Sequence, residues 1–414
     1  MKNLIRLTAA CCLIFASCQK EELTQLEPEI TTTTAKGSSA FTNASNQMVV
    51  QYDPGYTEFQ KQQLRNAYGV QEIKTCACAD PTLELWIFNN GTGASGVDLE
   101  EKVIAAKEDS DLEGADFNPI FDHGGIKLGS IFGSPDTATA MSKVVPDNAN
   151  VTIAILDTGI DYNYFGFNAP FLYNNLQNPE SCDATGSQDY YGWDFVNQDN
   201  DPYDDYGHGT IIGSYIFNTL HERGIDFQLL PIKAFDGNGN GNYFDILCGF
   251  KYALNNPDVD VINMSFGWYW QDYEIFSRYM DQSQNRVVIA TSAGNDRLNT
   301  DQEVHYPSAY PYQNIVASAA LGNSTNGVSL ASFSNYGTNS VDIAAPGQDL
   351  PFYLDSTNYI LVSGTSYSNA YVSAHAGITY NPSNNVIQHI QTMIQEAYYH
   401  PNLGNIQYSA YIYY

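Results

Sequence analysis

Residues 151–156, Val-Thr-Ile-Ala-Ile-Leu, form a continuous β-branched and apolar run that ends directly at Asp157. A run without polar alternation is typical of a strand buried on both faces, and such strands belong to mostly parallel sheets covered by helices. In open sheets of this kind, functional side chains collect where the strands end. The run therefore predicts a three-layer α/β domain with Asp157 at its functional edge.

Two further segments carry side chains suited to catalysis. His208 stands between two glycines, just before an apolar helical run, and glycine neighbours allow a substrate to approach closely. Ser366 ends Ser-Gly-Thr-Ser, between an apolar run and a run of small residues, which predicts a strand, a tight turn and a helix. A lone histidine is more often structural, and Gly-Thr-Ser is a common turn. Together with Asp157, however, the two residues supply a nucleophile, a base and an orienting acid.

The order Asp157-Thr-Gly, His208-Gly-Thr and Gly-Thr-Ser366 resembles that of the subtilisin-like serine proteases, the subtilase or peptidase S8 family. Several spaced motifs in one order are more specific than any one of them. The resemblance covers about residues 148–398 and implies a subtilisin-like fold. Further segments that fit it are 261–267, 290–295, 306–311, 331–337 and 342–347.

The resemblance also implies roles for individual residues. Ser366 would attack the scissile carbonyl, His208 would move the proton, Asp157 would orient the imidazole, and the Asn295 amide would face the oxyanion. The chemistry would need no cofactor. Substrate binding is expected at the cleft rim and beside the nucleophile, at Gly239, Gly241, Ser265, Phe266, Gly267, Ala293 and Gly294.

The chain departs from the family pattern in two helices. Ser368-Asn369-Ala370 stand where the family usually has Ala-Ser-Pro, and Ile211-Ile212-Gly213-Ser214 stand where it has His-Val-Ala-Gly. These changes favour an alternative function, a catalytically weak surface lipoprotein that uses the fold for binding. A surface structural protein is a further alternative, favoured only by the tyrosine-rich and acidic composition.

Residues 47–118 predict a separate small domain with the order strand, helix, strand, strand, helix and a last strand. That order suits a ferredoxin-like α+β unit. The family resemblance implies a propeptide that assists folding and then acts as an intramolecular inhibitor; the alternative is an unrelated binding module. Residues 119–147, rich in Pro, Gly and Asp, are then the processing linker, and His123 within them is expected to be a loop residue rather than a ligand.

The two ends of the chain carry different signals. Residues 1–17 have a basic start and a short apolar run, and with Cys18 they resemble a bacterial lipoprotein signal with lipidation at Cys18; an ordinary cleaved signal is the alternative. Residues 18–46 are expected to form a flexible tether on the outer membrane or cell surface, with the lipid as the sole membrane contact. Residues 399–414 are a C-terminal extension without an assigned role.

Charge excludes one class of partner and suggests a metal. Acidic residues outnumber basic ones 46 to 17, giving a net charge of −29, which argues against nucleic acid. We expect a monomer that acts on proteins or peptides. Alternating acids in a loop can hold structural calcium, here Asp199, Asp201, Asp204 and Asp205, although a solvated acidic loop fits equally.

Four cysteines follow the signal: Cys76, Cys78, Cys182 and Cys248. They allow three pairings, and the sequence does not choose among them. Cys76 and Cys78 are too close in the chain for an easy mutual bridge.

Overall fold

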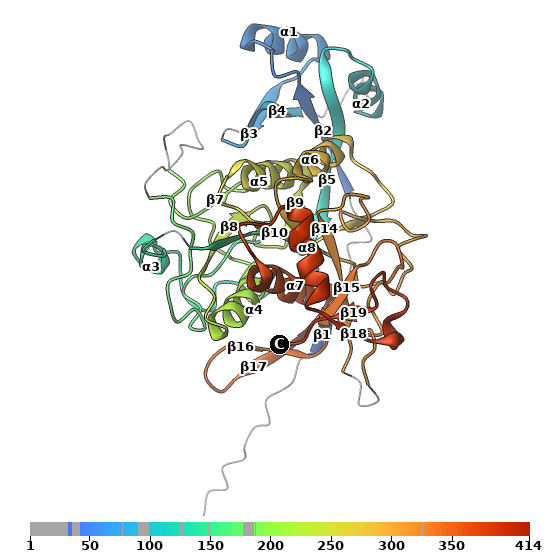
Figure 1. The fold of residues 1–414 in the computed structure, drawn as a ribbon. Coiled ribbons are helices and arrows are strands. Elements are labelled where there is room, and N and C mark those ends of the chain that lie inside the picture. The colour runs from blue at the N-terminus through green and yellow to red at the C-terminus, as the bar shows by residue number, and fades with distance from the viewer. Residues whose placement is uncertain are drawn as a thin grey trace, which may run out of the picture.

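The computed structural model describes residues 32–34, 42–76, 78–89, 99–124, 127–147, 149–176, 186, 188–323 and 327–414. The lipidation residue Cys18 and Cys182 lie outside the described residues. Within them, no helix is both long and apolar enough to cross a membrane. The chain forms a small N-terminal α+β unit, residues 42–122, above a larger main domain, residues 149–414 (Figure 1).

The N-terminal unit has the predicted element order. Its antiparallel strands follow the spatial order β3-β4-β2-β5, which is that of a ferredoxin-like sheet. Helix α1 begins at a capping box between Thr57 and Gln60 and ends at Gly69, whose left-handed φ of 71° favours glycine. The elements are β2 (Thr42–Tyr52), α1 (Glu58–Tyr68), β3 (Glu72–Cys76), β4 (Asp80–Ile87), α2 (Leu99–Lys107) and β5 (Leu112–Asp122).

Strand β5 corrects the predicted boundary at residue 118. It continues to Asp122, because beyond the N-terminal sheet it pairs antiparallel with β9 (Asn240–Asn242) of the main domain. Figure 1 shows this strand running from the small unit down into the larger one. The predicted linker therefore begins as strand, and it also contains helix α3 (Thr137–Lys143).

The main domain is built on a nine-stranded sheet in the order β18-β19-β15-β14-β12-β10-β6-β8-β7. Every neighbouring pair is parallel except β18 with β19, so the expected mostly parallel sheet is confirmed. The strands are β6 (Val151–Asp157), β7 (Trp193–Asp194), β8 (Phe227–Lys233), β10 (Val261–Met264), β12 (Val288–Ser292), β14 (Ile315–Leu321), β15 (Ile343–Pro346), β18 (Tyr398–Tyr399) and β19 (Ala410–Tyr411).

Helices cover both faces of this sheet, which confirms the three layers. Along β6, Ile153 and Ile155 pack among the residues of α4 (His208–Glu222) and α7 (Thr365–Thr379). The alternate residues Ala154 and Leu156 pack among those of α5 (Tyr243–Asn255) and α6 (Glu274–Ser283). Helix α8 (Val386–Gln395) adds to the α7 side, and the N-terminal unit rests on α5 and α6 (Figure 1).

Two short segments revise other expectations from the sequence. The predicted tether contains strand β1 (Thr32–Thr34), which pairs in parallel with β17 (Tyr359–Ser363), itself antiparallel to β16 (Leu350–Tyr353). The predicted C-terminal extension supplies β19 and the 3₁₀ helix η1 (Pro401–Leu403), so it forms an edge of the main sheet. Strands β11 (Trp268–Tyr269) and β13 (His305–Tyr306) make a small separate pair.

A disulfide between described residues links the two units. Cys76 at the end of β3 is bonded to Cys248 in the middle of α5. Cys78 is also disulfide-bonded. Of the pairings that the sequence left open, the structure thus selects one that crosses from the N-terminal unit to the main domain.

Candidate active site

The three candidate catalytic residues come from different elements that meet at the carboxyl edge of the sheet. Asp157 is the last residue of β6, His208 is the first of α4, and Ser366 is the second of α7. Gly207 precedes α4 with a backbone φ of 120°, which residues other than glycine rarely adopt. A Cβ at this position would also lie only 2.8 Å from the Leu128 side chain. The glycine predicted to allow close approach is therefore needed by the backbone itself.

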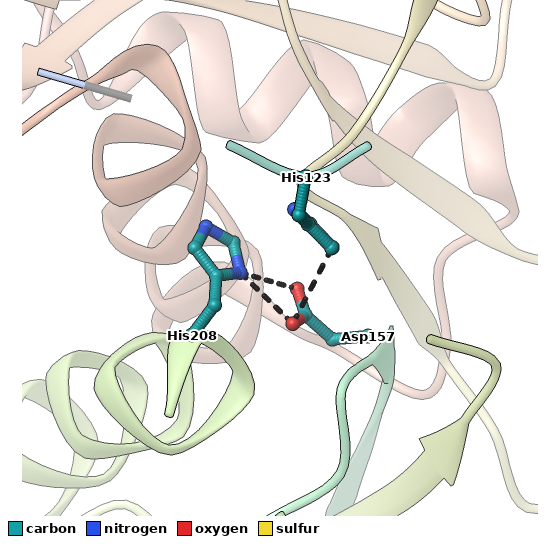
Figure 2. A group of neighbouring side chains, drawn as sticks. All are labelled: His123, Asp157 and His208. Atoms are coloured by element: carbon teal, nitrogen blue, oxygen red, sulfur yellow. Dashed lines mark hydrogen bonds and ion pairs between the residues drawn. The ribbon is translucent and has the colours of Figure 1, made fainter. Parts of the chain in front are cut away.

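Asp157 and His208 form a buried, oriented pair. His208 Nδ1 lies 2.8 and 3.0 Å from the two carboxylate oxygens of Asp157 (Figure 2). Burial raises the pKa of Asp157, but the neighbouring His208 ring and the hydrogen bonds from His208 and the Thr158 N–H outweigh it, so the pKa lies below its ordinary value. The carboxylate is thus ionised, and it holds the His208 tautomer that carries its proton on Nδ1 and presents Nε2 as the free base.

Ser366 is not yet hydrogen-bonded to that base. Its Oγ donates to the backbone carbonyl of Ser265 at 3.0 Å, and Ser265 Oγ donates back to the Ser366 carbonyl at 3.1 Å. His208 Nε2 is buried without a hydrogen-bond partner among the described residues. Such loose geometry is common before a substrate binds, so the arrangement does not exclude a nucleophile and its base.

Asn295 is oriented as an oxyanion donor would be. Its side-chain Oδ1 accepts hydrogen bonds from the backbone N–H of Thr365 at 2.8 Å and from the Thr365 hydroxyl at 3.0 Å. This fixes which end of the amide is oxygen, so the Nδ2 group is left to donate beside Ser366.

The residues predicted to bind substrate fall into two sets. Gly239 and Gly241 line the ladder edge, where Gly241 pairs with Phe121 and the Gly239 carbonyl accepts the His123 N–H at 2.8 Å. Ser265, Phe266, Gly267 and Gly294 line a cavity of about 20 Å³ next to Ser366 and Asn295. Ala293 is fully buried behind it and belongs to a separate apolar cluster.

His123 is the functional residue that sequence reasoning missed. It does follow β5 as a loop residue, but its buried ring lies 4.2 Å, centroid to centroid, from both His208 and Phe235. Its Nε2 is 3.6 Å from Asp157 Oδ1 and has no hydrogen-bond partner among the described residues (Figure 2). Burial lowers the pKa of His123 to about 3, so the ring is neutral.

The four acids predicted to bind calcium do not form one site. Asp204 is buried, and its carboxylate accepts the N–H groups of Tyr206, Gly207 and Thr210 at the start of α4. Asp205 pairs with the buried Lys233 at 2.8 Å. The hydroxyls of Tyr162 and Tyr191 donate hydrogen bonds to the Asp201 carboxylate, and the Asp201 N–H donates to the Asp199 carboxylate.

Among the described residues, the only three potential metal ligands within 4.8 Å of one another are His123, Asp157 and His208. Asp204 and Asp205 thus have other partners in this fold, and calcium binding by the acidic loop stays a prediction.

The departure from the family pattern in α7 lies in the core. Ser368 Oγ donates to the Ala345 carbonyl at 3.1 Å, and the Asn369 amide donates to the Ala290 carbonyl at 3.0 Å. Both side chains are fully buried. They hold the first turns of α7 against the sheet through hydrogen bonds and leave Ser366 at the helix start.

Several known proteins are similar to this chain in sequence. The chain is 29% identical over 260 residues to the thermophilic serine proteinase of Bacillus sp. (strain AK1), covering 61% of this chain and 58% of that protein. It is 30% identical over 265 residues to the cell wall-associated protease of Bacillus subtilis (strain 168), covering 63% of this chain and 26% of that one. The chain thus spans only 26–58% of the length of these curated relatives.

A solved structure, that of a cold adapted subtilisin-like serine proteinase, aligns with a TM-score of 0.46 and 22% identity, over 66% of this chain and 94% of that chain. Residues 148–404 match the subtilase family, Peptidase_S8. The match contains Asp157, His208, Asn295 and Ser366. The chain therefore belongs to the subtilase family.

Proposed function

We propose that the protein is a serine endopeptidase that uses Ser366, His208 and Asp157 as its catalytic triad and Asn295 as its oxyanion donor. The observation that carries this proposal is the buried Asp157–His208 pair, with its 2.8 Å bond, beside a serine at the start of α7. Membership of the subtilase family supports it.

In the proposed reaction, Ser366 Oγ leaves the Ser265 carbonyl, turns to His208 Nε2 and attacks the scissile carbonyl. His208 takes the hydroxyl proton and later gives it to the leaving amine, while ionised Asp157 stabilises the imidazolium. The Asn295 amide and the Ser366 backbone N–H donate to the oxyanion. Water then hydrolyses the acyl-enzyme. All groups needed for these steps belong to this chain.

We also propose that the N-terminal unit is an inhibitory prosegment. Its strand β5 enters the cleft as a substrate strand would, pairing residues 120–122 with 240–242. The ring of His123 then lies against the base His208. The carbonyl of the next residue, Gly124, accepts the Tyr206 hydroxyl at 2.9 Å. A peptide cannot occupy the same ladder while this strand is in place.

Self-processing within residues 119–147 follows from the same contact. A bond held beside the nucleophile by its own chain reacts without a bimolecular encounter, an advantage that also benefits a slow enzyme. The docked ladder ends at Asp122, with one further hydrogen bond from the His123 N–H, and we expect the cut shortly beyond these residues, after Gly124.

A fluorophosphonate probe tests the endopeptidase proposal. We expect the processed wild-type protein to be labelled, and we expect Ser366→Ala to remain unlabelled and to accumulate as the uncut chain. Mass spectrometry reads both outcomes. No labelling of a folded wild type, together with an intact chain, would favour the binding lipoprotein. The same cut in wild type and in Ser366→Ala would assign processing to another protease.

We further propose that Cys18 is lipidated and that the protein lies on the outer face of a bacterial envelope. The basic start, short apolar run and Ala-Ser-Cys ending support this. A fatty-acid analogue should tag the wild type and not Cys18→Ala; equal tagging would rule the anchor out. Protease accessibility on whole cells tests the surface location.

A further inference from the structure

The cavity beside Ser366 is closed by a histidine. His305 is only 2% exposed, and its ring, with Gly267 and Gly294, forms one wall of this cavity. Residues 121–123 of the docked strand line it as well, and about 20 Å³ stays empty beside them. A space of that size holds roughly one water molecule. When a substrate replaces the docked strand, the His305 ring still fills the space between Gly267 and Gly294, next to Ser366 and Asn295. The side chain of the residue whose carbonyl reaches Ser366 would meet this ring, so the smallest side chains fit best.

The His305 ring is held firmly in that position. Its Nδ1 is 2.8 Å from the Ser308 hydroxyl, and its ring lies edge-on to Tyr269 at 4.8 Å. The backbone of His305 is fixed by the pairing of β13 with β11. A Cβ on Gly267 would lie 2.3 Å from the His305 ring, so the facing wall is already in contact with it. The cavity therefore cannot deepen without displacing a packed ring.

The docked strand shows what the neighbouring positions of the cleft accept. Phe121 is buried, and its ring stacks on Trp268 at 5.0 Å and meets Tyr273 edge-on at 6.3 Å. Asp122, the next residue, is exposed. Three residues after Phe121, and two residues beyond the end of β5, the chain carries a glycine, Gly124.

We propose that His305 makes this enzyme selective for glycine, or at most alanine, immediately before the scissile bond. With the aromatic site at Trp268, the substrate class is peptides of the form aromatic-X-X-glycine. The inference rests on the proposed peptidase function. Because the His305 ring fills the space that a larger side chain would need, its removal should transfer selectivity to larger residues.

Quenched fluorescent peptides containing Phe-Asp-His-Gly, with the glycine replaced in turn by alanine, leucine and phenylalanine, test the proposal on the processed full-length protein. We expect kcat/KM to fall at least about tenfold from glycine to leucine and further to phenylalanine, given what burial of such side chains is worth. Any prosegment left in the cleft competes equally with all four peptides, so the ratios remain valid. Replacing the first phenylalanine by alanine should also reduce kcat/KM.

His305→Gly should raise kcat/KM for the phenylalanine peptide by about ten- to a hundredfold relative to the glycine peptide. Gln302→Ala, an exposed position of the same loop, is the matched control and should leave every ratio unchanged. Equal cleavage of all four peptides by a wild type that reacts with the fluorophosphonate would overturn the specificity while keeping the peptidase. Absence of both cleavage and labelling would remove the two proposals together. If His305→Gly does not fold, the wild-type series decides alone.

Discussion

At the scale of the residue, one amide carries a separable part of the proposed chemistry. Thr365 holds Asn295 by its oxygen, so the position of the amide nitrogen is set before a substrate arrives. A donor fixed in advance needs no rearrangement when charge develops, and this is why such donors contribute strongly to the rate.

Asn295→Ala is therefore expected to lower kcat by about 10²–10³ with little change in KM, because the lost hydrogen bond forms mainly in the transition state. Steady-state kinetics with the Phe-Asp-His-Gly peptide measure both constants. The melting temperature checks that the fold is intact. A rise in KM alone would show that Asn295 binds the ground state and would contradict the oxyanion role.

His123 makes the docked form sensitive to acid. Its pKa is lowered to about 3 by burial, against an ordinary value of 6.5. Between these values the unfolded chain binds a proton that the folded chain does not, so the free energy of unfolding rises with pH. Stability from neutral His123 is complete above about pH 6.5 and is lost as the pH falls toward 3.

The melting temperature of the uncut Ser366→Ala chain should thus fall more between pH 7 and 4 than that of the same chain carrying His123→Phe. Burial also lowers the pKa of His305 to about 3. His305 therefore destabilises both proteins at low pH to the same extent, and its effect cancels in the comparison. The exposed His221, replaced by Gln, is the control and should leave the pH dependence unchanged. If the melting temperature depends on pH in the same way for Ser366→Ala alone, with His123→Phe and with His221→Gln, His123 is not buried in the docked state.

At the scale of the element, strand β5 is part of the folded N-terminal unit and also the segment proposed to block the cleft. It belongs to the N-terminal sheet over most of its length and to the cleft at its end. On the way, buried Asp116 accepts the Ile275 N–H at 2.9 Å at the start of α6 and the Tyr243 hydroxyl at 3.0 Å. The strand is therefore held by two helices of the main domain as well as by the ladder.

Phe121→Ala should destabilise the docked Ser366→Ala chain by about 3–5 kcal/mol, since it removes a buried ring and leaves a cavity. Ile120→Ala is the matched control. Ile120 is next to Phe121 but 37% exposed, so its replacement should cost less than about 1 kcal/mol. Denaturant unfolding measures both. Equal losses at the two positions would mean that the aromatic site does not anchor the strand.

The sequence predicts the elements that have local signatures. An apolar run before Asp157, glycines around His208 and the turn before Ser366 each indicate both an element and a role. His123 has no such signature, because its place depends on pairing between β5 and β9, two segments far apart in the chain. Asp204 shows the same limit: an acidic residue in a loop can bind a metal or cap a helix, and only the packed start of α4 decides.

At the scale of the whole molecule, the two units are linked covalently by a disulfide as well as docked against each other. Processed wild type should migrate as one species without reductant and as two with it. Replacing both Cys76 and Cys78 by serine should give two species under either condition. Gel electrophoresis of the processed protein decides this. Two species from wild type without reductant would show that the Cys76–Cys248 bond is absent from the mature protein.

The bond between Cys76 and Cys248 changes what cleavage can accomplish. An inhibitor that remains attached cannot be diluted away, and its effective concentration at the cleft stays near the millimolar range of short linkers. Cutting the chain would then relax the inhibition without ending it, and reduction of the bond or destruction of the prosegment would be the committing step. If Cys18 carries the lipid, the same bond holds the cut catalytic half at the membrane, so that activation and release from the cell become one event.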